Sequence, residues 1–144
     1  MDASGIADLL GRQRAAFARD SYPSLDVRLA RLRRLQELLE RDGDALARAI
    51  SADFGHRSLH ETAIAETFFV LAGLAHTRRH LKRWMRARRV ATSFHSLPGT
   101  SRILPQPVGV VGVVSPWNYP LQLALAPGGA GLAAGHGVPT KPSR

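Results

Sequence analysis

The segment from Val108 to Val114 limits the possible folds of this chain more than any other. It lacks polar–apolar alternation, so it predicts a strand that is buried on both faces, as strands of parallel sheets are. A helix is expected from Tyr119-Pro120 to about Ala134, because proline is tolerated in a first helical turn. Residues Val138 to Lys141 predict a second strand. Strand, helix and strand make a βαβ unit, so we expect a parallel sheet and an α/β fold.

Most of the sequence before this segment predicts amphipathic helices. One is expected from about Gly5 to Arg19, and a second from Leu25 to about Arg41 with Ser24 as its N-cap. A break at Gly43-Asp44 should start a further short helix. That helix should end in a left-handed cap at Gly55.

A long helix is expected from Ser58 to about Arg86. Its start, Ser58-Leu59-His60-Glu61, matches the capping box, in which two side chains satisfy two backbone amides. The apolar residues that follow recur at three- and four-residue steps, so they should face the core. The residues predicted to face inward are Ile64, Phe68, Leu71, Leu74, Leu81 and Trp84/Met85.

A hairpin is expected between this helix and the apolar strand. Residues Val90 to Ser96 and Ser101 to Gln106 flank Leu97-Pro98-Gly99-Thr100, where Pro98-Gly99 fit the two central positions of a type II turn. The chain therefore divides into a helical segment over residues 1–89, a hairpin over 90–107 and the start of a sheet domain over 108–144.

Composition excludes several kinds of site and location. The 144 residues include no cysteine, so disulfides, cysteine–zinc sites and a cysteine nucleophile are excluded within them. No stretch reaches the roughly 18 apolar residues that a membrane span requires. The N-terminus has no apolar region of the kind found in secretory signals. We therefore expect a cytoplasmic protein.

The net charge of +9 comes mostly from arginine and is concentrated in one basic tract. A basic helix that carries Trp84 could contact nucleic acid phosphates. No recognised nucleic-acid-binding motif accompanies the tract, and a solvated helix face that complements the helix dipole is the simpler interpretation. We favour the solvated face and keep nucleic acid binding as an alternative. The tract consists of Arg78, Arg79, Lys82, Arg83, Arg86, Arg88 and Arg89.

Two histidine pairs, His76/His80 and His56/His60, have the four-residue spacing of a helical metal clamp. No carboxylate completes the first pair, and arginines surround it. His56 precedes its helix. No metal site is therefore expected.

Polar residues follow both strands of the expected sheet. Ser115 to Asn118 come directly after the first strand, and Lys141 to Ser143 come after the second. Ligands bind outside the carboxyl ends of the strands in open parallel sheets, so an amide and an ammonium group should lie along one edge. A rigidly held amide can stabilise a developing oxyanion. The alternative is that Asn118 only forms a turn or caps the helix.

The order of these residues resembles that of the aldehyde dehydrogenase superfamily. The similar blocks are Pro107-Val108-Gly109-Val110-Val111-Gly112, Ser115-Pro116-Trp117-Asn118-Tyr119-Pro120, Ala133-Ala134-Gly135 and Lys141-Pro142-Ser143. Upstream, residues 50–58, 60–62 and 80–85 resemble the bacterial coniferyl aldehyde dehydrogenase branch of that family. The resemblance covers nearly the whole chain from about Leu25.

This resemblance implies an enzyme that oxidises an aldehyde to a carboxylic acid with NAD or NADP. In such enzymes a cysteine thiolate adds to the carbonyl, hydride passes to the nicotinamide, and a carboxylate activates water. Asn118 matches the family's oxyanion-stabilising amide. Tyr119 and Leu123 match positions that line the aldehyde channel, where an aromatic wall would suit a phenylpropanoid aldehyde.

The resemblance also implies that residues 108–144 begin a Rossmann-like NAD(P)-binding domain, which is incomplete. The hairpin resembles part of the family's oligomerisation element, so a homo-oligomer is implied for the full-length protein. The positions that match cofactor-binding residues are Val114, Ser115, Pro116, Trp117, Lys141 and Ser143.

Several residues depart from the family pattern. Arg144 stands where a ribose-binding glutamate is usual, and His136 replaces an asparagine. Pro139 lies in a strand, and Gly128-Gly129 lie in the expected helix, where each glycine costs about 1 kcal/mol relative to alanine. Because nucleophile and general base are both missing, we expect a truncated N-terminal portion that is inactive by itself. The alternative is a non-catalytic protein that pairs with full-length subunits through the hairpin.

Overall fold

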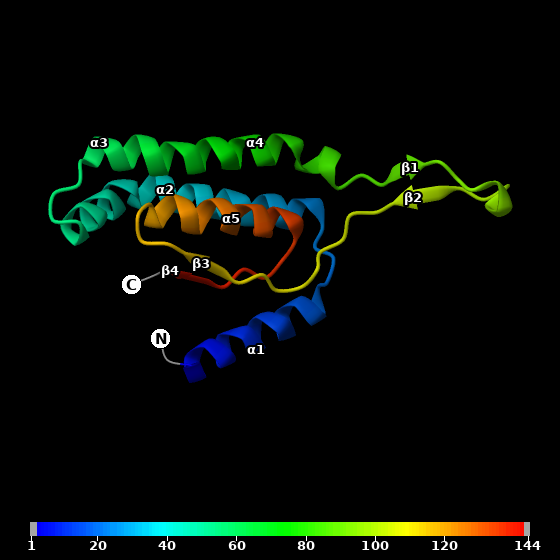
Figure 1. Cartoon of the computed structure of the whole chain (residues 1–144), viewed down its shortest axis with the longest axis horizontal. Helices are drawn as coiled ribbons and strands as arrows, with labels where there is room; N and C mark the ends of the chain where they lie inside the picture. Colours follow the sequence, from blue (N-terminus) through cyan, green and yellow to red (C-terminus); the bar gives the residue numbers. More distant parts are fainter. Residues whose placement is uncertain (1–2, 143–144) are drawn as a thin grey trace.

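The structure, a computed structural model, describes residues 3–142 of the chain. Three helices, α2 (Leu25–Asp53), α4 (Phe69–Trp84) and α5 (Pro120–Ala134), pack against one another and form the centre of the molecule (Figure 1). Among the described residues, no helix is both long and apolar enough to cross a membrane. The buried core consists of Leu32, Leu39, Ile50, Val70, Leu74, Leu81, Leu121 and Ala133.

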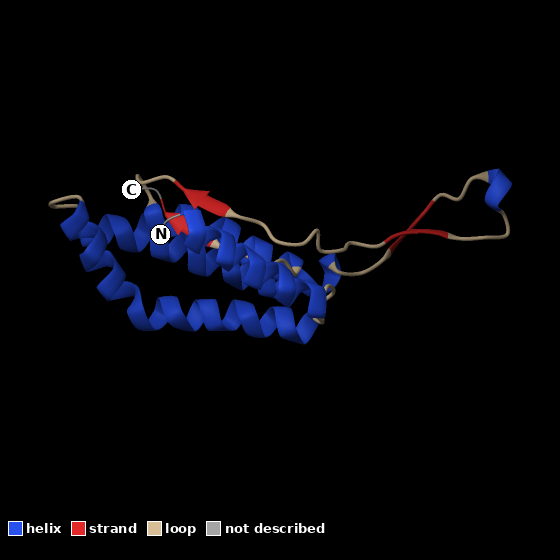
Figure 2. Cartoon of the chain, turned by 90° about the horizontal axis from the view of Figure 1, so that it is seen from below, coloured by secondary structure: helices blue, strands red, loops and turns tan. Residues whose placement is uncertain are grey.

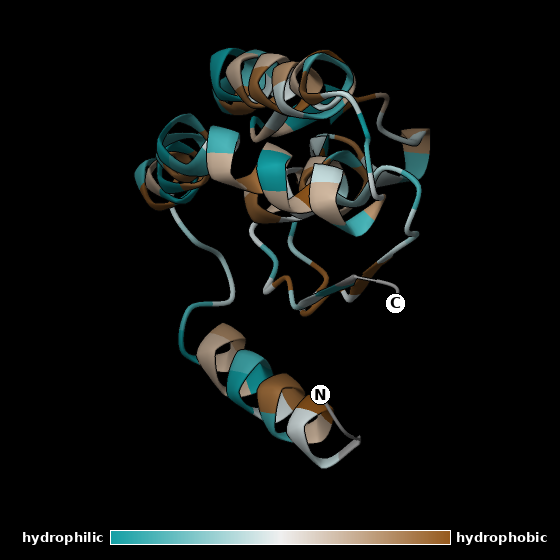
Figure 3. Ribbon diagram, turned by 90° about the vertical axis from the view of Figure 1, so that its left-hand side faces the viewer, coloured by the Kyte–Doolittle hydropathy of each residue, from teal (hydrophilic) through white to brown (hydrophobic). Residues whose placement is uncertain are grey.

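A small sheet and a hairpin complete the fold. The strands β3 (Val113–Ser115) and β4 (Thr140–Pro142) pair in parallel and lie against α5. The first helix, α1 (Ala3–Arg19), lies on the other side of this sheet, separated from the three central helices (Figure 3). The antiparallel hairpin of β1 (Arg88–Val90) and β2 (Ser101–Ile103) projects away from the body (Figure 2).

The predicted break at Gly43 is wrong, because α2 runs without interruption from Leu25 to Asp53. A glycine inside a helix costs only about 1 kcal/mol. Ala47 and Ile50, which follow it, are buried. Their burial against the neighbouring elements outweighs the cost of the glycine, so the helix continues.

The predicted helix caps are largely confirmed. Ser24 Oγ accepts a hydrogen bond of 3.3 Å from the N–H of Val27 at the start of α2. Gly55, just beyond the end of α2, has a left-handed backbone with φ of 85°. Ser58 Oγ accepts a hydrogen bond of 3.4 Å from the N–H of Glu61, which is one of the two hydrogen bonds of the predicted capping box.

The expected long helix is present in three consecutive parts. They are α3 (Leu59–Thr62), a π-helix η1 (Ala63–Phe68) and α4. Leu74 and Leu81 are buried as predicted, and Leu71 packs at the edge of the core.

Two residues of this helix face solvent although their spacing predicted burial. Ile64 and Phe68 are 64% and 60% exposed, so their predicted inward positions are wrong. Of the predicted pair Trp84/Met85, Met85 packs against the core and Trp84 is 44% exposed. Thr62 and Glu66 take buried positions instead. Burial recurs at positions 62, 66, 70 and 74, a wider step than the 3.6 residues of an α-helical turn. The π-helical segment explains this wider step, because its hydrogen bonds span five residues.

The hairpin is confirmed, with shorter strands than predicted and a different turn. A short 3-10 helix, η2 (Phe94–Ser96), already bends the chain before the proline. The peptide bond before Pro98 is cis, and the N–H of Gly99 donates a hydrogen bond of 2.8 Å to the oxygen of Ser96. The turn therefore starts one residue earlier than predicted, with Pro98 in its third position. The prediction of a type II turn is wrong.

The βαβ unit is confirmed, since β3, α5 and β4 follow one another and the strands are parallel. A further bridge between Val110 and Gly137 extends the pairing. The prediction that the first strand is buried on both faces is wrong. Val113 and Ser115 are buried, whereas Val114 is 76% exposed, because α5 covers only one face of the sheet.

Two departures from helix and strand rules have a packing explanation. In the Gly128-Gly129 pair, a Cβ added to Gly129 would lie 3.0 Å from Cδ2 of Leu74, so glycine allows α5 to approach α4 closely. Pro139 contributes only its oxygen to the sheet, where it accepts a hydrogen bond of 2.9 Å from the N–H of Val113. The missing N–H of proline is therefore not needed in this pair of strands.

Candidate active site

The candidate site is the segment Pro116-Trp117-Asn118-Tyr119-Pro120, which connects the end of β3 to the start of α5. Parallel pairing brings the carboxyl ends of β3 and β4 to the same edge of the sheet, with Ser115 opposite Pro142. This edge is the usual position of a ligand in an open parallel sheet. The end of β3, which lies shortly before Asn118, and the end of β4, which lies just after Lys141, are thus neighbours.

The residues predicted to contact a cofactor lie largely at the surface. Val114 and Trp117 are 76% and 64% exposed, and Pro116 is also exposed. Ser115 differs, because it is 1% exposed and its Oγ has no hydrogen-bond partner among the described residues. The accessible part of this segment is therefore formed by Val114, Pro116 and Trp117, on either side of the buried Ser115.

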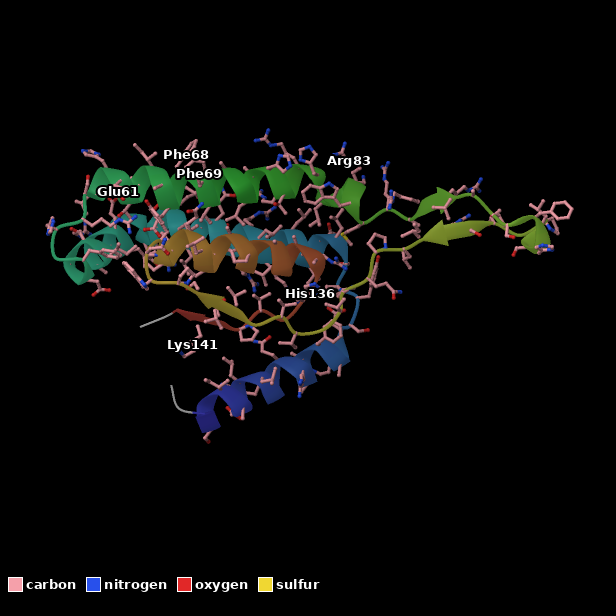
Figure 4. All side chains as sticks on the ribbon, viewed as in Figure 1. Glu61, Phe68, Phe69, Arg83, His136 and Lys141 are labelled. Carbon is pink, nitrogen blue, oxygen red and sulfur yellow. The ribbon has the colours of Figure 1, made fainter. Side chains whose placement is uncertain are left out.

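Lys141 and Val114 are opposite each other in the register of the sheet, so both stand on the same face. Figure 4 shows Lys141 on the side of the sheet that is directed toward α1. Its side chain is exposed, and no ion pair of Lys141 is found among the described residues. The remaining predicted residue, Ser143, lies outside the described residues.

Arg57 contacts the candidate site through its buried side chain. Its side chain is only 6% exposed, and its Nη1 donates a hydrogen bond of 2.7 Å to the main-chain oxygen of Asn118. The guanidinium carbon lies 4.5 Å from the ring centre of Tyr119 and 5.0 Å from that of Phe54. The ring of Phe54 in turn lies 6.1 Å from that of Trp117. One cation therefore contacts several groups around the turn.

Glu66, in the π-helix, is completely buried and contacts the start of α5. Its Oε2 accepts hydrogen bonds of 2.7 Å and 3.1 Å from the backbone N–H groups of Leu121 and Gln122. Its Oε1 lies 3.5 Å from Nη1 of Arg57. A carboxylate is favourable at this end of a helix, where the unpaired N–H groups carry partial positive charge.

Sequence reasoning missed both Arg57 and Glu66. Arg57 was noted only as part of residues 50–58, which resemble the family. On the long helix, Ile64 and Phe68 were predicted to be buried, and Glu66 was not. The available signal was the four-residue spacing of Thr62 and Glu66 before the buried Val70. A carboxylate that is buried within such a row of residues needs a hydrogen-bond or ion-pair partner inside the protein.

An apolar groove of about 710 Å³ lies beside the turn, between the second half of α2 and the first half of α5. Tyr119 and Leu123, the predicted channel residues, are half-buried and are not part of its lining. The groove is lined by Leu46, Ala49, Ile50, Asp53, Phe54, Trp117, Pro120, Leu121, Ala124 and Leu125.

The basic tract lies on α4, on β1 and on the segment between them. The end of α4 and β1 are at the opposite end of the body from the start of α5 (Figure 1). Arg78 donates a hydrogen bond to Gln36 of α2. The rings of His76 and His80 stack at 4.1 Å, and those of His80 and Trp84 at 5.7 Å. Within the part of the chain that the structure describes, no group of three metal-ligating side chains is found.

The exposed groups at the sheet edge suit part of a dinucleotide site. An ammonium group offers three donors to the hydroxyl groups of a ribose, and an asparagine amide offers two donors to an oxygen. Val114, Pro116 and Trp117 are exposed beside them, whereas Ser115 is buried. This arrangement can bind and orient a ligand, and it contains a donor for a reacting oxygen.

Comparison with known families and curated proteins gives consistent matches. Residues 2–144 match the family model described as "Aldehyde dehydrogenase family". A probable coniferyl aldehyde dehydrogenase of Pseudomonas aeruginosa is 40% identical over 135 residues, which are 94% of this chain and 28% of that protein. A coniferyl aldehyde dehydrogenase of a Pseudomonas species is 37% identical over 142 residues, 98% of this chain and 29% of that protein. The chain thus spans under a third of the length of these relatives.

Solved structures agree with these matches. The substrate-bound AldH of Staphylococcus aureus superimposes with a TM-score of 0.90 at 26% identity, covering 99% of this chain and 31% of the other. Succinic semialdehyde dehydrogenase of Streptococcus pyogenes in complex with NADP+ superimposes with a TM-score of 0.84 over 99% of this chain and 30% of the other. At 23% identity, the second structure supports the fold alone.

Proposed function

This chain belongs to the aldehyde dehydrogenase family, and from that premise we propose that it supplies the N-terminal part of an enzyme that oxidises an aldehyde with NAD or NADP. The observation that carries the proposal is the turn after β3. In this turn Asn118 follows the carboxyl end of β3, on the side where parallel sheets usually bind ligands, and Nη1 of Arg57 donates a hydrogen bond of 2.7 Å to its main-chain oxygen. A donor on so fixed a backbone suits the stabilisation of a developing charge.

In this proposal, the carboxamide of Asn118 donates a hydrogen bond to the aldehyde oxygen as that oxygen becomes negative. Such a donor acts without reorganisation only if its backbone is already fixed. The buried contacts of Arg57 and Glu66 provide that support. The half-buried side chains of Tyr119 and Leu123 would line the path of the aldehyde. Tyr119 gives this path an aromatic wall, which fits the coniferyl aldehyde named for the relatives.

When bound, the nicotinamide cofactor supplies the acceptor for hydride. The residues proposed to hold it are the backbone of Val114 to Trp117 and the ammonium group of Lys141, with Ser143 beyond the described residues. The exposed face shared by Val114 and Lys141 supports this assignment. Lys141 would donate to a ribose hydroxyl.

The 144 residues contain no cysteine, so a thiolate nucleophile has to come from residues outside them. The purified chain is therefore expected to oxidise no aldehyde. Measurable NAD- or NADP-dependent oxidation by the purified chain, with contaminating enzyme removed, would contradict this part of the proposal.

The test of Asn118 is a chimera in which this chain replaces the matching part of the P. aeruginosa relative. The chimera should oxidise coniferyl aldehyde, and Asn118→Ala should lower kcat by about 100- to 1,000-fold with little change in KM. Gln106→Ala, at an exposed position in the return from the hairpin, is the control and should leave kcat unchanged. Full activity of Asn118→Ala would overturn the role of the amide.

We also propose that the hairpin joins copies of the full-length protein. It projects from the body (Figure 2). It carries exposed apolar side chains, of which Phe94 is 81% exposed and Leu97 59%. Exposed apolar surface of this kind is typical of protein–protein contacts. Light scattering of the chimera should show an oligomer that Phe94→Asp with Leu97→Asp dissociates. An unchanged mass would contradict the proposal.

A further inference from the structure

We propose that Arg57 is a positioning residue for the reaction, and that Glu66 holds Arg57 and the start of α5 in a fixed relation. This inference rests on the proposed function of Asn118. Arg57 would act through its neighbours: it fixes the main chain from which the carboxamide of Asn118 projects, and it fixes the ring of Tyr119.

The geometry of Arg57 suits this role. Its guanidinium is buried, with 6% of the side chain exposed, and it reaches the turn from the loop after α2. Nη1 donates to the oxygen of Asn118, while the guanidinium carbon lies 4.5 Å from the ring centre of Tyr119. A planar guanidinium makes both contacts from one rigid group, whereas an ammonium group is a point charge on a flexible stem and fixes its partners less well.

Glu66 connects this cation to the helix. A carboxylate has two oxygens, and each has a separate task here. Oε2 accepts the N–H groups of Leu121 and Gln122, and Oε1 faces Nη1 of Arg57 at 3.5 Å. Glu66 therefore contacts the first turn of α5 directly, and it contacts the carbonyl of Asn118 indirectly through Arg57.

The consequence for catalysis follows from distance. A reacting group that is misplaced by about 1 Å can lose about 100-fold in rate. Removal of Arg57 frees the oxygen of Asn118 and removes the cation over Tyr119. We therefore expect a lower kcat for every aldehyde, through Asn118, and a higher KM for aromatic aldehydes in particular, through Tyr119.

The first test needs no activity and uses the 144-residue chain itself. Asn118 is the only asparagine of the sequence, so selective 15N labelling of asparagine gives the pair of signals of one side-chain NH2 group. In the unaltered chain, its heteronuclear NOE should be that of an ordered group. Arg57→Met should lower it to that of a mobile side chain, and Arg57→Lys should lower it partly. Arg48→Met, which removes an exposed arginine of α2, is the matched control and should leave it unchanged.

Circular dichroism separates loss of order at Asn118 from loss of the fold. If Arg57→Met does not fold, Arg57→Lys carries the test, because it keeps a cation opposite Glu66. A carboxamide of Asn118 that is mobile in the unaltered chain would overturn the proposal. So would a carboxamide that is as ordered in both Arg57 variants as in the unaltered chain.

The second test is a double-mutant cycle in the chimera. Arg57→Met should lower kcat by about 100-fold in the parent and have no further effect on kcat after Asn118→Ala, because both changes remove the same interaction. It should raise KM for coniferyl aldehyde more than for a short aliphatic aldehyde. Independent, additive effects on kcat would overturn the positioning role. A fully active Asn118→Ala would instead overturn the role of Asn118 itself, so the two failures are distinguishable.

Discussion

Glu66 and Arg28 lie at opposite ends of α5, and each carries the charge that its end of the helix favours. Glu66 accepts the N–H groups of the first turn, while Arg28 Nη1 donates to the oxygens of Ala133 and Ala134 at 3.2 Å and 2.9 Å. Both side chains are buried, at 0% and 4% exposure. Free N–H groups at a helix start and free oxygens at its end need such partners. Because α5 joins β3 to β4, these two contacts fix both ends of the βαβ unit.

Glu66→Gln should lower the free energy of unfolding by about 1–3 kcal/mol. Glutamine keeps one oxygen for the N–H groups of Leu121 and Gln122, but it removes the charge that faces the buried Arg57. Urea unfolding followed by circular dichroism measures the shift in midpoint. Hydrogen exchange at Leu121 and Gln122 should also accelerate in the variant.

Glu61→Gln is the control for this change. Glu61 lies 3.3 Å from Nη2 of the same arginine, but its side chain is 49% exposed. An exposed ion pair contributes about 0–1 kcal/mol, so the midpoint should move much less. Equal shifts for Glu61→Gln and Glu66→Gln would show that the burial of Glu66 has no special effect.

Arg28→Met should lower the free energy of unfolding by about 2–3 kcal/mol. Three backbone oxygens lose a donor, because Arg28 Nε also donates to Pro23 at 2.9 Å. Burial lowers the pKa of Arg28, and the nearby Tyr22 partly opposes this effect. Arg34→Met, at an exposed site of α2, should change stability by less than about 0.5 kcal/mol. A similar loss in both variants would indicate an effect of net charge instead.

Most elements of this fold were predictable because their signals are local. The caps at Ser24 and Gly55 and the βαβ order are encoded within a few residues of each boundary. The continuation of α2 through Gly43 was not predictable in this way. It depends on burial of Ala47 and Ile50 against elements that are distant in the sequence.

In the candidate site too, the residues with local sequence signals were predictable and those with distant partners were not. Asn118 and Lys141 were predictable as neighbours of the strand ends, since parallel strands bring their carboxyl ends together. Arg57 and Glu66 were not, because their partners at Asn118 and Leu121 lie 61 and 55 residues further along the chain. Burial of Glu66 among apolar residues is also not expected from the sequence, because its partner, the first turn of α5, is known only from the structure.

Gly131→Ala should destabilise the protein by about 1–3 kcal/mol, although alanine favours helices. A Cβ at this position of α5 would lie 2.7 Å from Cγ2 of Val138, which is too close without movement of the segment before β4. Thermal unfolding measures the effect. Gly73→Ala is the matched control in α4, where an added Cβ meets nothing within 4 Å. That change should stabilise the protein by about 0.5–1 kcal/mol, and a loss of stability there would contradict the argument from packing.

His136 follows the left-handed Gly135 after α5, and its position in the molecule is labelled in Figure 4. Its Nδ1 accepts a hydrogen bond of 3.3 Å from the N–H of Val108, which requires an unprotonated nitrogen. The pKa of His136 is lowered from the ordinary value of 6.5, first by burial and second by the positive charge of Arg28. Arg31 and Asp20 line the same cavity. The folded protein therefore favours the neutral imidazole.

Acidification below about pH 6.5 should weaken the fold through this residue. The unfolded chain binds a proton at His136 in that range while the folded chain does not, so the contribution is complete above pH 6.5 and is lost as the pH falls. Thermal unfolding between pH 8 and pH 5 measures the loss. His136→Asn keeps an acceptor for the N–H of Val108 and removes the titration, so its stability should fall less on acidification. His95→Asn, at an exposed position of the hairpin, should behave as the unaltered chain does. Identical pH profiles for His136→Asn and the unaltered chain would show that His136 is not the responsible group.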